Sequence, residues 1–294
     1  MRPSLALANR YYTSGSLCML SRRNFLVAAG SLAAGLPFSS AQALGNYPIG
    51  IQLYTVREWM NQDPVGTLKQ LAAIGYTLLE SYQGDKGIYF GLKPAEFTKI
   101  AHDLGMTLFA SHFNLGKTAE TSITQAAEVG LKYMIVPYNK LTDLETTKRA
   151  VDEYTRLGEL CKKHGVQFGY HNHGYDFETF DGVVPYELFL KQIDPKLMIM
   201  EMELYWFARM NIDPLTYIQN YPGRFPIWHV KDMDKQDRTA NTEVGKGSID
   251  YKRLFKHAKQ AGLQYSIVEQ DGHFHPSVWP SLTTSFGATK VLGR

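Results

Sequence analysis

The sequence has only two cysteines, and its first 43 residues contain no acidic residue. The cysteines are Cys18 and Cys161, so removal of the N-terminal segment that holds Cys18 would leave no partner for an internal disulfide. The same segment carries four arginines, and its loss takes the formal net charge from +3 to −1. A near-neutral chain lacks the positive field that attracts nucleic acid, and we expect no nucleic-acid partner.

The segment without acidic residues has the features of an export signal. Residues 21–26 read SRRNFL, a twin-arginine motif, followed by an apolar run over 27–36 and an Ala41-Gln42-Ala43 cleavage pattern. The run has roughly half of the ~20 residues that a membrane-spanning helix needs. An amphipathic helix packed on the domain is the alternative, but the run has almost no polar face. We therefore predict a twin-arginine signal peptide over 1–43, with Met19 as a candidate true start.

This prediction has consequences for location and partners. A twin-arginine signal is recognised by the Tat translocase, which exports folded proteins, so we expect a periplasmic protein. Cys18 precedes the apolar run, which is the wrong order for a lipid anchor, and the run is too short to stop in a bilayer. We expect no stable membrane anchor.

After residue 44 one pattern recurs: an amphipathic stretch, then a glycine, then a short apolar run that ends in a polar or ionisable residue. The glycines at 75, 105, 130, 165 and 262 fit the position just after a helix, where a left-handed backbone favours glycine. The apolar runs predict eight strands, at about 49–55, 76–81, 106–112, 132–137, 166–173, 198–204, 226–231 and 264–270.

Eight strand–helix units over 44–294 predict an α/β fold, a single (β/α)8 TIM barrel, because near-continuous apolar strands are typical of parallel sheets. A doubly wound open sheet is the alternative. Such sheets usually have a phosphate-binding glycine loop after the first strand, whereas QLYTVREWMNQDP, residues 52–64, contains no glycine. We therefore favour the barrel and a single domain.

Ligand-type side chains are concentrated where the predicted strands end, which is the active-site end of such barrels. They are Glu80, His112, His171, His173, Glu201, Glu203, His229, Lys231, Glu269 and Asp271. Residues two apart on a strand share a face, so His171 and His173, or Glu201 and Glu203, are expected to point the same way. If these faces line the barrel, the side chains converge.

The glutamates in LMIMEMELYWF and YSIVEQD need partners, because an unpaired buried carboxylate costs several kcal/mol. Ion pairs from Lys231 and Arg209 are one solution. A metal shared among the later strands satisfies more of them at once, and a set of carboxylates and imidazoles suits Mn, Co, Zn or Fe(II) better than Ca or Mg.

Motifs along the chain resemble the sugar phosphate isomerase/epimerase family of xylose-isomerase-like barrels. They are QLYTVR, YHNHGYDF, MEMELYW, WHVKDMD, VGKGSIDY and VEQD, in the family's order over essentially all of 44–294. The resemblance implies a divalent metal, with Glu203, His229 and Glu269 as ligands. At the fourth ligand position, on strand 5, many relatives have glutamate and this chain has His171, which is open as a ligand, as a base, or as both. Strand 6 carries Glu203 where relatives carry aspartate.

The resemblance also implies roles in catalysis. In this family a base removes a proton next to a sugar carbonyl and an ene-diolate forms, and Glu269 or His171 is the candidate base. Lys231 is expected to stabilise developing negative charge, unless it is simply an ion-pair partner of Asp232 or Asp234. Tyr54, His112, Tyr138 and His173 are expected to line the sugar pocket, and Trp206 to stack on a sugar ring or to be core.

Several functions fit these residues. The first is a metal-dependent sugar isomerase or epimerase. The second is a 3-keto-glycoside lyase, which uses the same proton removal to expel the C1 substituent; it needs only one base, and free or glycosidic sugars are expected outside the cytoplasm. The third is a periplasmic sugar-binding protein without catalysis. A metal-dependent nuclease on a related barrel is disfavoured by the charge. In each favoured case the ligand is a small sugar or glycoside.

Overall fold

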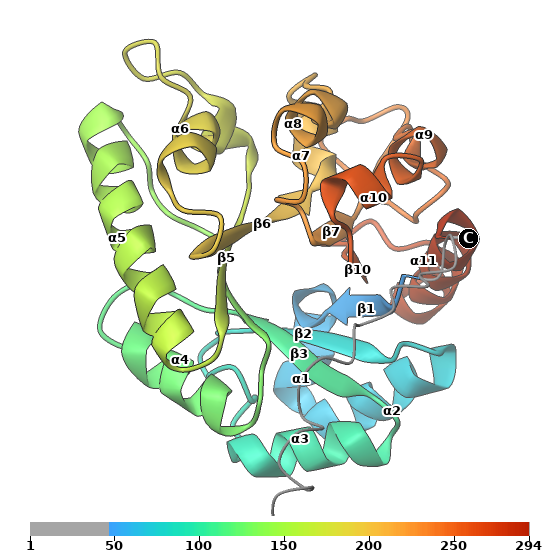
Figure 1. Cartoon of the computed structure of the whole chain (residues 1–294). Helices are drawn as coiled ribbons and strands as arrows, with labels where there is room; N and C mark the ends of the chain where they lie inside the picture. Colours follow the sequence, from blue (N-terminus) through green and yellow to red (C-terminus); the bar gives the residue numbers. More distant parts are fainter. Residues whose placement is uncertain (1–46, 294) are drawn as a thin grey trace, which may run out of the picture. The chain divides into compact units, whose positions relative to one another are not determined.

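The computed structural model describes residues 47–293, so the predicted signal peptide lies outside the described residues. The chain forms a closed barrel of eight parallel strands in the order β1-β10-β7-β6-β5-β4-β3-β2, with helices around it (Figure 1). This confirms the predicted (β/α)8 TIM barrel. Within 47–293, no helix combines the length and apolar character that crossing a membrane would require.

The barrel strands follow the predicted apolar runs. They are β1 (Ile49–Gln52), β2 (Leu78–Tyr82), β3 (Thr107–His112), β4 (Tyr133–Val136), β5 (Gln167–His171), β6 (Met198–Glu203), β7 (Ile227–Val230) and β10 (Tyr265–Val268). The predicted ends differ most at β1, which stops at Gln52 instead of residue 55 because a 3-10 turn, η1 (Leu53–Val56), begins there. Two further short strands, β8 (Asp232–Met233) and β9 (Asn241–Thr242), form a hairpin after β7 that the sequence pattern does not predict.

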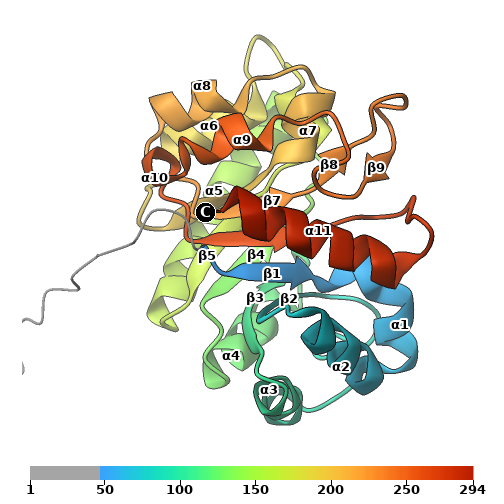
Figure 2. The same cartoon turned by 90° about the vertical axis from the view of Figure 1, so that its right-hand side faces the viewer.

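Helices connect the strands and cover the outside of the barrel. They are α1 (Arg57–Gln62), α2 (Pro64–Ile74), α3 (Pro94–Asp103), α4 (Ala119–Glu128), α5 (Leu144–Lys163), η2 (Gly174–Phe177), α6 (Pro185–Gln192), α7 (Leu204–Arg209), α8 (Pro214–Asn220), α9 (Tyr251–Phe255), α10 (Ala258–Ala261) and α11 (Val278–Leu292). The five glycines predicted to follow helices all have positive φ, for example Gly75 at 115° after α2. Figure 2 shows α11, which packs against β1, β10 and α2 and closes the ring.

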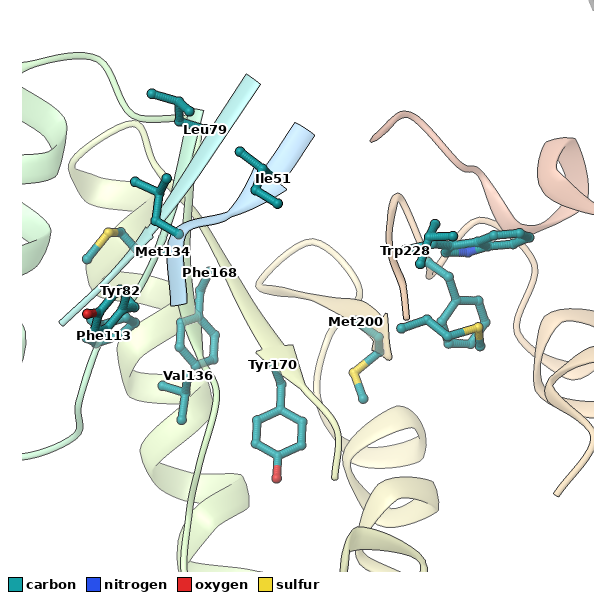
Figure 3. Packing of buried hydrophobic residues seen from close by; sticks show 14 of the residues in the cluster. Ile51, Leu79, Tyr82, Phe113, Met134, Val136, Phe168, Tyr170, Met200 and Trp228 are labelled. Carbon is teal, nitrogen blue, oxygen red and sulfur yellow. The ribbon is translucent and has the colours of Figure 1, made fainter. Parts of the chain in front are cut away.

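The outward faces of the strands supply most of the core. Phe168 of β5 lies against Tyr154 of α5, with ring centroids 5.8 Å apart, and Trp228 of β7 lies against Phe255 of α9 at 5.4 Å. Figure 3 shows Phe168 and Trp228 among the buried side chains of this layer, together with Ile51 and Met200. These contacts fix the rotation of each strand, and therefore also fix which residues point into the barrel.

The inward faces change character along the barrel axis. A separate apolar cluster of Phe109, Ala110, Tyr133, Ile135, Ile227 and Ile267 fills the interior toward the strand starts. Because side chains alternate, the next inward residues are polar: His229 follows Ile227 on β7, and Glu269 follows Ile267 beyond β10. The barrel interior therefore has an apolar floor and a polar, ionisable layer at its carboxyl end.

His112 reaches this layer only because β3 contains an irregularity. The pairing of β2 with β3 shifts between Leu79 and Glu80, so that Leu79 pairs with Leu108 while Glu80 pairs with Ala110. Phe109 is the extra residue, and both it and Ala110 belong to the interior cluster. Strict alternation from Phe109 would have placed His112 on the outer face, so this bulge is what directs it inward.

The packing beneath the site predicts a stability effect. Phe168 is fully buried on β5, the strand that carries His171. We expect Phe168→Ala to lower the free energy of unfolding by about 3–5 kcal/mol, because the cavity cannot collapse between β5 and α5. Urea unfolding followed by circular dichroism measures it. Val291→Ala on α11 is the control, since Val291 is 63% exposed and should change little. A loss below about 1 kcal/mol for Phe168→Ala would contradict this packing.

Candidate metal centre

The carboxyl ends of six strands deliver a cluster of buried ionisable side chains into the barrel. These are Glu80 from β2, His112 from β3, His171 from β5, Glu201 and Glu203 from β6, His229 from β7 and Glu269 just after β10. The predicted convergence of strand-end residues is therefore present. Lys231 and Asp271 lie two residues beyond His229 and Glu269; Lys231 contacts Glu269 of the cluster, and Asp271 contacts Lys231.

His229 lies at the centre of the cluster, between three carboxylates. Its Nδ1 is 2.7 Å from Glu269 Oε2, and its Nε2 is 2.7 Å from Glu80 Oε2 and 3.2 Å from Glu201 Oε2. Burial opposes a charge on the ring, but these carboxylates outweigh it and raise the pKa of His229 well above its usual value. Burial and the neighbouring Glu201 in turn raise the pKa of Glu80 to about 7.

Glu201 joins two further histidines. Its Oε2 is 2.7 Å from His112 Nε2 and 2.9 Å from His171 Nδ1. Although burial acts to raise the pKa of Glu201, the neighbouring histidines hold it well below the usual range. Burial lowers the pKa of His171 to about 4, so this ring is neutral near neutral pH, which is the form that can bind a metal or accept a proton.

Glu203 and Lys231 form the side of the cluster nearest the loops. Glu203 Oε1 accepts a hydrogen bond from the Tyr205 N–H at 3.0 Å, and Asn172 ties the backbone of Glu203 to β5. Glu203 Oε2 is buried without a hydrogen-bond partner, and burial raises the pKa of this carboxyl well above its usual value. The nearest cation is Lys231, whose Nζ lies 3.6 Å from that oxygen.

Lys231 donates to Asp271 and lies 3.8 Å from Glu269 Oε1. The alternative partners considered from the sequence are wrong. The Asp232 carboxylate accepts backbone N–H groups of the 245–249 loop, and Asp234 accepts those of residues 236 and 237. Arg209, the other expected cation, donates to the Tyr205 hydroxyl. Lys231 therefore remains as the cation beside Glu203 and Glu269.

Two overlapping groups of four side chains have the proximity that a metal ion requires. One is His171, Glu203, His229 and Glu269, the set predicted from the sequence, and the other is His112, His171, Glu201 and His229. In each group the potential ligand atoms lie within 4.8 Å of one another, and every member is buried. The unpartnered Glu203 Oε2 lies in the first group, so that group has an open acceptor that a cation would satisfy. A set of two carboxylates and two imidazoles fits Mn, Fe(II), Co or Zn.

The residues expected to bind substrate lie at different depths. His112 is inside the cluster, bound to Glu201. His173 lies just beyond β5, where strand pairing has ended, and its ring is 5.0 Å from that of His171. It stacks on Tyr175 and lies 5.4 Å from Trp206. Burial lowers the pKa of His173 to about 2, so its ring is neutral.

The two expected tyrosines lie at the rim. Tyr54 is 42% exposed, and Tyr138, at 58%, packs edge-on against Tyr175. Ring contacts thus extend from Tyr138 at the surface through Tyr175 to His173, which contacts both Trp206 and His171.

For three residues in or beside the cluster, Glu80, Glu201 and Gln52, no individual role was predicted from the sequence. Glu80 and Glu201 stand at predicted strand ends, but nothing in their spacing separates them from the ligand positions. Gln52, at the end of β1, donates to Glu80 Oε2 at 3.0 Å and accepts from the Tyr54 N–H at 3.0 Å. Because the first strand was predicted to run to residue 55, nothing in the sequence marked Gln52 as a strand-end residue.

Comparisons with known proteins agree with this architecture. Residues 68–276 match the sequence family described as xylose isomerase-like TIM barrel. No curated protein matched. Among solved structures, a sugar phosphate isomerase/epimerase from Parabacteroides distasonis ATCC 8503 is 25% identical with a TM-score of 0.74, over 88% of this chain and 98% of that one.

Two more distant structures share the fold. D-psicose 3-epimerase from Clostridium cellulolyticum H10, solved with D-tagatose, is 13% identical with a TM-score of 0.65, over 83% of this chain and 99% of that one. The IOLI protein, solved with a bound zinc atom, is 14% identical with a TM-score of 0.66, over 83% and 97% of the two chains.

The geometry predicts how metal binding responds to loss of Glu203. We expect Glu203→Gln to weaken Zn²⁺ or Mn²⁺ binding by more than the roughly 10–100-fold typical of a residue outside the ligand set. Isothermal titration calorimetry on metal-free protein measures the change. Glu187→Gln is the control, because Glu187 forms an exposed ion pair with Lys191 on α6. Equal affinities for wild type and Glu203→Gln would remove Glu203 from the ligand set.

Proposed function

Because the chain belongs to the xylose isomerase-like TIM barrel family, we propose that it is a metal-dependent enzyme that removes a proton next to the carbonyl of a sugar. The observation that carries this proposal is the buried group of His171, Glu203, His229 and Glu269 at the carboxyl end of the barrel. Sugar isomerases and epimerases among the similar structures support the reaction class. Mn, Co, Zn and Fe(II) are the metals that the donor set favours.

We assign the four residues of this group as ligands. When bound, a divalent ion would withdraw electron density from a sugar carbonyl and its neighbouring hydroxyl and so acidify the adjacent C–H. Glu269 and His171 come from β10 and β5, with β7 and β6 between them, and each is a candidate base, His171 only where its Nε2 does not bind the metal. Burial opposes ionisation of Glu269, but Lys231 and His229 outweigh it and hold its pKa well below the usual range, so this carboxyl is in the ionised form that a base requires.

Lys231 and the aromatic side chains supply the rest of the proposed site. The Lys231 ammonium lies near both Glu203 and Glu269, where it can stabilise negative charge that develops on the substrate oxygen. Trp206 and His173 offer flat surfaces beside the ligand group, and Tyr138 and Tyr54 lie at its rim, which suits the apolar faces of a sugar. We propose an isomerase or epimerase of a small sugar as the primary function.

The histidine on β5 supports a second candidate, a 3-keto-glycoside lyase. A two-base epimerase needs a proton acceptor on each face of the sugar, and here one of them is His171, whose Nδ1 is engaged by Glu201. Elimination of the C1 substituent needs a single base at C2 and an acid for the leaving group. The proposed lyase therefore uses the same metal and the same base. It differs in the step after proton removal, in which the electron pair left at C2 expels the C1 substituent.

One experiment separates the candidates. Metal-loaded protein over 44–294 is incubated in D₂O with a 3-keto-glucoside and, separately, with free ketoses, and the products are analysed by mass spectrometry and NMR. Deuterium at the carbon beside the carbonyl with an intact skeleton supports the isomerase or epimerase. Release of the aglycone with an unsaturated sugar supports the lyase. If the sugars bind without exchange or cleavage, the non-catalytic binding protein is correct.

Loss of the proposed base should stop the exchange. We expect Glu269→Gln to slow deuterium incorporation or aglycone release by about 10²–10⁴-fold, because the amide cannot accept the proton. Rates are compared at saturating metal, with bound metal per protein measured in each sample, so that loss of a ligand is distinguished from loss of a base. Unchanged turnover in a fully loaded variant would show that Glu269 is not the base.

We further propose that the Tat translocase exports the chain to the periplasm. SRRNFL followed by an apolar run supports this location. Replacing Arg22 and Arg23 by lysine retains the charge but should abolish twin-arginine recognition, so the full-length variant is expected to stay in the cytoplasm while the wild type reaches the periplasm. Cell fractionation and immunoblotting measure this. The same periplasmic fraction for both proteins would contradict the proposal.

A further inference from the structure

Two carboxylates outside the proposed ligand group lie directly against its histidines. Glu80 and Glu201 are fully buried, and only one oxygen of each, Oε2, has a hydrogen-bond partner. On β6, Glu201 is two residues before Glu203 on the same face, so it lies one step deeper in the barrel. Buried carboxylates are costly to retain, which suggests that their contacts to the histidines serve the site.

Glu80 faces one specific nitrogen of His229. That ring uses Nδ1 toward Glu269, a member of the ligand group, and Nε2 toward Glu80. Glu80 is itself fixed, since the Gln52 amide donates to the same Oε2 while the other end of that amide accepts the Tyr54 N–H. The contacts from the Tyr54 N–H through the Gln52 amide therefore fix the position of Glu80 Oε2, which is the acceptor for His229 Nε2.

Glu201 has the matching relation to His171. Its Oε2 contacts His171 Nδ1 at 2.9 Å, which leaves Nε2 as the nitrogen available to the ligand group. His112 contacts the same oxygen through Nε2 at 2.7 Å and holds the carboxylate from the β3 side. Each of the two histidines therefore has one nitrogen on a deep carboxylate, while the other nitrogen faces the ligand group: His229 Nδ1 lies against Glu269, and His171 Nε2 has no contact to Glu80 or Glu201.

We propose that Glu80 and Glu201 are positioning residues that set which nitrogen each ligand histidine presents to the metal: Nδ1 of His229 and Nε2 of His171. This inference rests on the proposed function, because it assumes a metal held by His171, Glu203, His229 and Glu269. A carboxylate that accepts the remaining ring N–H fixes the tautomer and orientation of the imidazole and raises its basicity. A metal held instead by His112, His171, Glu201 and His229 would make Glu201 a ligand and not a positioning residue.

The test uses Co²⁺, whose visible absorption reports the geometry of its ligands. Wild-type protein and the variants E80M, E80Q, E201M and E201Q are titrated with Co²⁺, and affinity, stoichiometry and spectrum are recorded. Methionine has a similar size but accepts no useful hydrogen bond, whereas glutamine retains a neutral acceptor. We expect the methionine variants to bind about 10–100-fold more weakly with an altered spectrum, and the glutamine variants to fall between them and wild type.

A matched control comes from a buried carboxylate elsewhere. Glu243 accepts from Ser281 and from the His275 N–H, away from the cluster, so E243Q tests the effect of losing a buried charge alone. It should bind Co²⁺ as the wild type does. If a methionine variant does not fold, its glutamine counterpart carries the test, and wild-type affinity in that variant would overturn the proposal.

Other outcomes are equally distinct. Equal affinities and spectra for E80M, E201M and wild type would show that the two carboxylates only fill space. Complete loss of Co²⁺ binding in E201Q with normal binding in E203Q would place the metal on the His112 group and overturn the inference. Failure of the wild type to bind Co²⁺, Zn²⁺ or Mn²⁺ would instead remove the proposed function on which the inference rests.

Discussion

The buried position of His229 among Glu80, Glu201 and Glu269 is the constraint on which the rest of the site depends. Carboxylates and imidazoles in an interior closed by an apolar floor cannot be left unpaired, so each must find a charge, a hydrogen bond or a metal. The barrel satisfies this by bringing opposite charges from six strand ends to one point. The same low-polarity surroundings lower the pKa of His171 and strengthen the electrostatic effect of Lys231 on its neighbours.

Strand periodicity allowed much of this to be predicted. Short apolar runs that each end in an ionisable residue gave the eight strands, and alternation within Met198–Glu203 placed Glu201 and Glu203 on one face. The bulge at Phe109, which turns His112 inward, breaks that alternation and has no signal in the sequence. The pairing of Lys231 with Asp271 was also beyond reach, because it joins two loops whose approach depends on barrel closure.

The resemblance to isomerases and epimerases supports the proposed reaction class, and the histidine on β5 bears on which product would form. Proton removal beside a sugar carbonyl is common to isomerisation, epimerisation and elimination, and these differ in what happens to the electron pair afterwards. With histidine in place of a second carboxylate on β5, the two sides of the site are chemically unequal. Such asymmetry favours a reaction in which a side chain on one side accepts the proton. A side chain on the other side then assists departure of the leaving group or return of a proton.

The account depends on a metal at the group from β5, β6, β7 and β10. Crystals of the protein soaked in Zn²⁺ and measured at the zinc absorption edge would locate it by anomalous scattering. We predict one buried peak within bonding distance of Glu203, Glu269, His229 Nδ1 and His171 Nε2, at about 2.0–2.2 Å. A peak bound by His112 and Glu201, or no buried peak at all, would contradict the account.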